Sequence, residues 1–184
     1  MSTEELLERP YHVMDILPMQ VPADGGGQYF KVEQYYRMND VGRLSRQYAD
    51  VLLKLNCYCD LVFSHDAEHW QLNPEPETIV GMVHDCLSEE PTEACLYVML
   101  AEGSMLLTLQ RDATHMTLYH LTDELLQLLC QLASAAGLFV WSPPTQSQDR
   151  AFPEIQTGHA PHGEEPETAH HAAARPRNNE TDVQ

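Results

Sequence analysis

Between residues 95 and 120, three short apolar segments follow one another with nothing but turns between them. The segments are residues 95–100, 104–110 and 115–120, and turn residues separate them at Glu102-Gly103 and Arg111-Asp112-Ala113. Parallel strands need a crossover connection of about a dozen residues or more, so connections this short allow only antiparallel pairing. The pattern therefore predicts an antiparallel meander.

Three helices are predicted by apolar residues that recur at spacings of three and four. The first follows Asn39-Asp40, either of which can cap it, and its apolar stripe runs from Leu44 to Leu55. The second follows Asn73-Pro74, because proline suits the first turn of a helix. The third begins after Thr122 as its cap and ends at Gly137.

Five further strands are predicted, at residues 11–17, 29–36, 58–64, 69–72 and 138–141. Along the chain, neighbouring strands follow each other without helical crossovers. This order indicates an α+β fold, a mostly antiparallel sheet with about three helices packed on one face.

The composition changes at Pro143-Pro144, where Pro, Gln, Thr, His, Glu and Ala begin to dominate. Beyond that point the sizeable apolar residues are Phe152, Ile155 and Val183, too few to offset the entropy lost on ordering. We therefore predict one folded domain over residues 1–142 and a disordered tail over residues 143–184. The domain carries 21 acidic and 7 basic residues, a net of -14, so the acidity belongs mainly to the folded part.

Acidic residues outnumber Lys and Arg in the whole chain by 28 to 10, which gives a formal net charge of -18. A charge of this size repels nucleic acid and anionic membranes, and few bases are present to displace counterions from phosphates. We therefore expect a basic protein surface as the partner and no direct binding to nucleic acid or membrane. The predicted acidic surface consists of Glu75, Glu77, Asp85, Glu89, Glu90 and Glu93. A solvated charged edge without a partner explains the same residues.

Aromatic residues crowd the predicted strand at 29–36. Tyrosine is enriched at binding hot spots, so Tyr29, Tyr35 and Tyr36 are the predicted anchors of a partner surface. Half-buried tyrosines that cover a sheet edge account for the same pattern.

Five cysteines, an odd number, occur in a chain long enough to fold without disulfides, which indicates reduced thiols and a cytoplasmic protein. The N-terminus lacks the basic start and apolar run of a signal peptide. No apolar stretch approaches the ~18 residues of a membrane span.

The candidate metal ligands are Cys57, Cys59, His65 and His69, because zinc prefers thiols and imidazoles. Against this, a zinc thiol pair is normally separated by two or more residues. A C-x-C pair in a strand also directs its side chains to opposite faces. One buried and one solvent-facing cysteine is the alternative, and no cofactor is assigned.

The sequence contains no G-x-S-x-G elbow, no P-loop and no H-E-x-x-H motif. It favours a non-enzymatic binding protein, specifically an inhibitor that occupies the basic groove of a nuclease or another DNA- or RNA-handling protein. Anti-restriction and anti-CRISPR proteins that mimic nucleic acid illustrate this mode, an analogy of charge and size and not of sequence. Two alternatives stay open: a metal- or thiol-dependent enzyme built on the four candidate ligands, and a self-associating structural or assembly subunit with an open sheet edge. Either a monomer or a homodimer fits.

Overall fold

The computed structural model describes residues 10–22, 26–88, 95–111 and 113–143. The chain divides into two units, Met1–Gln148 and Asp149–Gln184. The second unit lies outside the described residues, as does the predicted tail apart from residue 143, so the disorder of that tail stays a prediction. Within the described ranges, no helix combines the length and the apolar composition that crossing a membrane requires.

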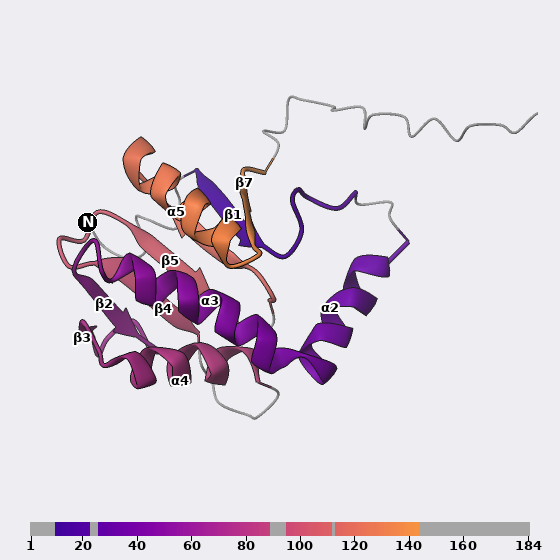
Figure 1. Cartoon of the computed structure of the whole chain (residues 1–184), viewed down its shortest axis with the longest axis horizontal. Helices are drawn as coiled ribbons and strands as arrows, with labels where there is room; N and C mark the ends of the chain where they lie inside the picture. The colour runs from indigo at the N-terminus through magenta and orange to yellow at the C-terminus, as the bar shows by residue number, and fades with distance from the viewer. Residues whose placement is uncertain (1–9, 23–25, 89–94, 112, 144–184) are drawn as a thin grey trace, which may run out of the picture. The chain divides into compact units, whose positions relative to one another are not determined.

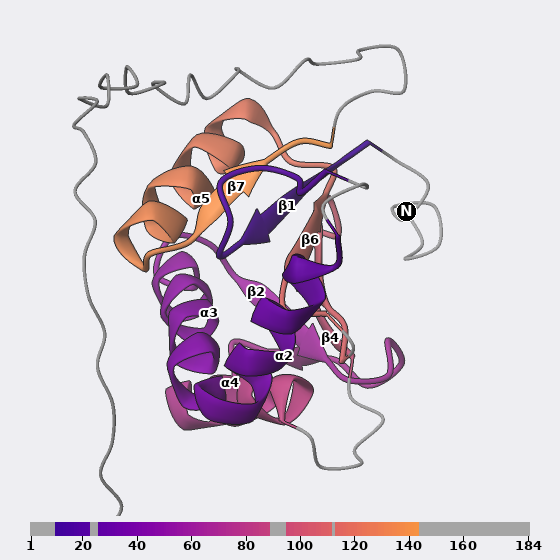
Figure 2. The ribbon, with the colours of Figure 1, turned by 90° about the vertical axis from the view of Figure 1, so that its right-hand side faces the viewer.

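Seven strands in the described residues form one antiparallel sheet (Figures 1 and 2). In spatial order they are β3 (Gln71–Leu72), β2 (Leu61–Ser64), β4 (Leu96–Leu100), β5 (Leu106–Leu109), β6 (Met116–Tyr119), β1 (Tyr11–Asp15) and β7 (Phe139–Trp141). The strands β4, β5 and β6 are the predicted meander, and the antiparallel α+β fold is confirmed. The first strand lies between β6 and β7, so segments from opposite ends of the domain are neighbours.

Three helices cover one face of the sheet: α3 (Val41–Leu55), α4 (Pro76–Leu87) and α5 (Asp123–Ala135), as Figure 2 shows. These are the three helices that the apolar spacing predicts. The Thr122 side chain accepts a hydrogen bond from the backbone N–H of Leu125, which confirms it as the cap of α5. Gly137 follows that helix with φ +79°, a left-handed conformation that glycine adopts without a Cβ penalty.

The strand predicted at 29–36 is wrong, because these residues belong to a fourth helix, α2 (Gln28–Asn39). Its half-buried residues are Tyr29, Glu33, Tyr36 and Arg37, whose spacing has the period of a helix. The aromatic residues at 29, 30, 35 and 36 suggested a strand, but they do not alternate with polar residues as a half-buried strand requires. Gly27, with φ +77°, turns the chain immediately before the helix begins.

No residue of α2 is buried, and Figure 1 shows the helix projecting away from the helical layer. Polar contacts hold it to the segment between β5 and β6. The Glu33 carboxylate accepts hydrogen bonds from Thr114, at 3.1 Å from its backbone N and 3.0 Å from its Oγ1. The Arg37 guanidinium donates to the Arg111 carbonyl at 2.9 Å. Its position is therefore set by a few hydrogen bonds and not by an apolar face.

The strand predicted at 58–64 begins only at Leu61, because the chain turns from residue 56 to 59 after α3 ends. Cys57 and Cys59 therefore lie in this turn and not in a strand. The strand predicted at 69–72 is reduced to β3, which pairs with β2 along one edge of the sheet.

A buried tyrosine ties the helical layer to the sheet. Tyr48 of α3 is fully buried, and its hydroxyl donates to the Thr114 carbonyl at 2.6 Å, with the Met14 carbonyl as a second acceptor at 3.2 Å. A buried carbonyl that loses its donor bears an uncompensated desolvation penalty.

We expect Tyr48→Phe to lower the free energy of unfolding by about 1–3 kcal/mol, because the carbonyl of the buried Thr114 loses the donor that lies 2.6 Å away. Urea denaturation followed by circular dichroism measures this loss. Tyr35→Phe is the matched control, since 60% of Tyr35 is exposed and removal of its hydroxyl should change stability little. Equal stability of the two variants would contradict the proposed tie.

Candidate functional site

The predicted acidic surface is visible in part. Glu75, Glu77 and Asp85 are exposed at the two ends of α4. Glu89, Glu90 and Glu93 lie outside the described residues.

The structure adds a segregation of charge that those six residues only hint at. From Leu55 to Gln110 the chain contains no Lys or Arg. This stretch forms β2, β3, α4, β4 and β5, and the four strands are neighbours at one end of the sheet. Seven described acids of this stretch are exposed, and we call them the acidic side: Asp60, Asp66, Glu68, Glu75, Glu77, Asp85 and Glu102. By contrast, five of the six described Lys and Arg residues lie on α2 and α3.

Exposed apolar side chains lie among these acids. Tyr58 is 69% exposed, Leu72 on the edge strand β3 is 60% exposed, and Val80 on α4 is 44% exposed. A surface that combines charge with exposed apolar residues is suited to docking another protein.

The three predicted tyrosine anchors all lie on α2, but they do different things. Tyr35 is 60% exposed. Tyr36 makes a cation–π contact with Arg43, whose Cζ lies 5.1 Å from the centroid of the tyrosine ring. Tyr29 is half-buried and lines a cavity, so the three do not form one anchoring surface.

The four candidate metal ligands do not come together. The Cys57 and Cys59 thiols lie 3.4 and 3.5 Å from the carbonyls of Leu53 and Leu55, while the His69 ring contacts Asp66 at 2.7 Å. In the described part of the chain, no three His, Cys, Asp or Glu side chains form a group that could hold a metal ion.

The surroundings of three cysteines raise the pKa of their thiols. Burial, followed by the charges of Asp60 and Glu102, raises the pKa of Cys59. Burial raises the pKa of Cys86 to about 12 and also raises the pKa of Cys130. A raised pKa leaves less of each thiol as the nucleophilic thiolate at neutral pH than in a free cysteine.

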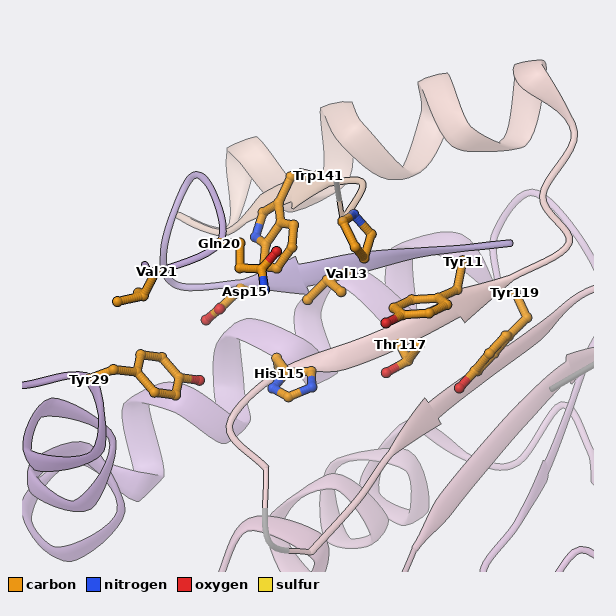
Figure 3. A pocket seen from close by; sticks show the side chains of 11 residues that line it. Tyr11, Val13, Asp15, Gln20, Val21, Tyr29, His115, Thr117, Tyr119 and Trp141 are labelled. Atoms are coloured by element: carbon orange, nitrogen blue, oxygen red, sulfur yellow. The ribbon is translucent and has the colours of Figure 1, made fainter. Parts of the chain in front are cut away.

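A cavity that the sequence did not reveal lies on the sheet face opposite the helical layer (Figure 3). Its volume is about 410 Å³. Because side chains alternate along a strand, Tyr11, Val13 and Asp15 of β1 face this cavity while Met14 enters the core. On one side, the wall consists of His115, which precedes β6, and of Thr117 and Tyr119 of β6. On the other side it consists of Trp141 of β7 and Pro143, which follows that strand. The segment after β1 adds Gln20 and Val21, and α2 adds Tyr29.

Asp15 is the unusual member of this lining. It is only 4% exposed, and its Oδ1 has no hydrogen-bond partner. Burial is the main cause that raises the pKa of Asp15, and the charge of Glu33 adds to it. Hydrogen bonds from the backbone of Leu17 and Ile16, and the charge of His115, act in the opposite direction.

Two other side chains of the lining are also unusual: the pKa of Tyr29 is raised, and the indole N–H of Trp141 has no partner. Burial raises the pKa of Tyr29, a hydrogen bond with Thr114 lowers it, and the charges of Asp15 and Glu33 raise it. The buried indole Nε1 of Trp141 has no acceptor. The cavity therefore holds an unpaired acceptor and an unpaired donor, which is rare for buried groups unless a ligand or water satisfies them.

Comparison with known proteins gives no match. No family model matches the chain, and no curated protein or solved structure is similar to it. Any function must therefore be inferred from the residues of the chain itself.

Asp15→Asn tests whether the buried carboxylate serves the fold. Because burial raises the pKa of Asp15 in the folded state, its ionised form costs stability above that pKa. The cost disappears below the unfolded value of about 3.9, where both states are protonated. We therefore expect Asp15→Asn to have a higher Tm than the wild type near neutral pH and an equal Tm near pH 3.

The Tm of each protein is measured by circular dichroism at both pH values. Asp123→Asn is the matched control, because it removes the same charge from an exposed position in the first turn of α5. A lower Tm for Asp15→Asn at neutral pH would show that the carboxylate stabilises the fold.

Proposed function

We propose that this protein is a non-enzymatic binding protein that places its acidic side against a basic surface of another protein. The supporting observation is the charge segregation: a stretch without Lys or Arg folds into one end of the sheet and exposes seven acids there. Electrostatic complementarity of this kind steers association and selects the partner.

Two features favour a protein as the partner. A surface of this charge repels the phosphates of nucleic acid and of anionic lipid. The exposed side chains of Tyr58, Leu72 and Val80 add apolar area. A protein partner can bury this area in an interface, whereas a purely ionic partner cannot.

The partner class that fits best is a nucleic-acid-handling protein such as a nuclease. Its groove is basic because it must neutralise phosphates, and an acidic protein can occupy the same groove as an inhibitor. Glu89, Glu90 and Glu93 directly follow α4 in the sequence and belong to this proposal as further acids.

A pull-down from host lysate at about 50 mM salt, repeated at about 500 mM, identifies the partner, which is then purified for calorimetry. We expect the double variant Glu75→Lys with Glu77→Lys to bind this partner at least about tenfold more weakly at low salt. The measured quantity is the Kd at each salt concentration.

Asp123→Lys with Glu124→Lys is the matched control, because these two exposed acids also lie at the start of a helix but outside the acidic side. It makes the same change in net charge and imposes a similar cost on the helix dipole. An equal loss of affinity in both variants, or binding insensitive to salt, would contradict docking through the acidic side.

Self-association is a second candidate, favoured by the two edge strands of the described sheet. Leu72 on β3 is 60% exposed and Phe139 on β7 is 46% exposed. An open edge offers unpaired backbone groups to another copy of the chain. Sedimentation over a range of protein concentrations separates this candidate from the first, because it alone requires a homodimer in the absence of another protein.

A further inference from the structure

We propose that the cavity on the open face of the sheet binds a small organic ammonium ion with an aromatic body and a hydroxyl group. This site lies beside β6, β1 and β7, at the opposite end of the strand order from the acidic side. It is therefore independent of the docking function proposed above.

The charge of the cavity selects a cation. Asp15 lines it, and Glu33 is close enough for its charge to act on both Asp15 and Tyr29. No Lys or Arg is among the residues that line the cavity. Among the described residues that line the cavity, His115 is the one that can carry a positive charge, and its charge acts on Asp15. The Oδ1 atom of Asp15 still has no hydrogen-bond partner, and a bound ammonium ion would give it one.

The unpaired oxygen of Asp15 selects an ammonium that can donate. A primary ammonium carries three N–H donors, whereas a quaternary one carries none. Rotation about the Cβ–Cγ bond of aspartate is broad, so either oxygen can be presented to the cavity. A charge-assisted hydrogen bond to a carboxylate is stronger than one between neutral groups.

Aromatic side chains form much of the remaining wall. The ring centroids of Tyr11 and Tyr119 are 5.8 Å apart with an interplanar angle of 45°. Trp141 lies on β7, on the other side of β1 from Tyr119. Figure 3 shows the Tyr29 ring directed from α2 toward the space between Asp15 and His115. Aromatic faces attract both cations and other rings. An aromatic amine can therefore stack on the aromatic lining and pair its ammonium group with the Asp15 carboxylate.

The indole Nε1 of Trp141 supplies the last requirement. It is buried, it can only donate, and it has no acceptor in the structure. A ligand hydroxyl gives it one. The matching chemical class is a hydroxyaryl alkylamine, for which tyramine is a simple probe.

The experiment uses the full chain and follows the indole N–H resonances by NMR during titration with tyramine up to about 10 mM. The chain has two tryptophans, Trp70 and Trp141, and Trp70→Phe assigns their resonances. We expect saturable shifts at Trp141. Trp70 serves as an internal reference, because its Nε1 already donates to the Ala67 carbonyl at 3.1 Å.

Matched ligands test each element of the proposal. 4-Ethylphenol lacks the ammonium group, and we expect it to bind at least about tenfold more weakly than tyramine. Phenethylamine lacks the hydroxyl, and we expect intermediate affinity. Equal binding of tyramine and 4-ethylphenol would overturn the proposal, as would the absence of any shift at Trp141.

Two variants test the residues. Asp15→Asn should lower the affinity for tyramine at least about tenfold and leave the affinity for 4-ethylphenol unchanged. Val21→Lys brings a competing ammonium to the wall from a half-buried position outside the sheet, and it should weaken tyramine without lowering the Tm. If the Asp15→Asn variant folds, unchanged tyramine affinity would overturn the proposed site. If it does not fold, unchanged tyramine affinity in Val21→Lys would overturn it. Charge reversal at Glu75 and Glu77 should leave tyramine binding intact, so failure of either proposal is distinguishable from failure of the other.

Discussion

The arrangement of both faces of the sheet depends on how Thr114 is held. This fully buried residue has its carbonyl bound by the Tyr48 hydroxyl of the helical layer, at 2.6 Å. Its backbone N–H and hydroxyl are bound by the Glu33 carboxylate of α2, on the other side. Because every polar group of Thr114 is satisfied in this way, the segment that leads into β6 has a single low-energy position. His115 and Thr117, which line the cavity, take their positions from it.

The two faces of the sheet differ in a way that selection for stability does not explain. The helical face is apolar and fully packed, with Leu52, Phe63 and Leu107 buried completely. The opposite face near β1 buries Asp15 and leaves an acceptor and a donor unpaired. Selection for stability alone would favour an apolar residue over a buried carboxylate whose Oδ1 has no hydrogen-bond partner. Its presence beside the cavity is therefore better explained by a ligand than by folding.

The sequence predicted the elements whose signals are local and missed those that depend on distant contacts. The helix α5 has its cap at Thr122, its apolar stripe and Gly137 within one short stretch, so all signals agree. For α2, the aromatic residues favoured a strand, and the contacts that fix the helix come from Thr114 and Arg111, far along the chain. The cavity was equally out of reach, because β1 contributes Asp15 and the end of the domain contributes Trp141, and only the strand order brings them together.

The wall that α2 adds to the cavity differs in kind from the walls that the sheet provides. No residue of α2 is buried, and its attachment to the rest of the domain rests on the hydrogen bonds of Glu33 and Arg37. The Arg37 bond is exposed, whereas the Glu33 bonds are part-buried and satisfy the fully buried Thr114. Tyr29 lies on this helix and faces Asp15 across the cavity. The Glu33 bonds therefore hold both the wall that carries Tyr29 and the Thr114 segment that leads into β6.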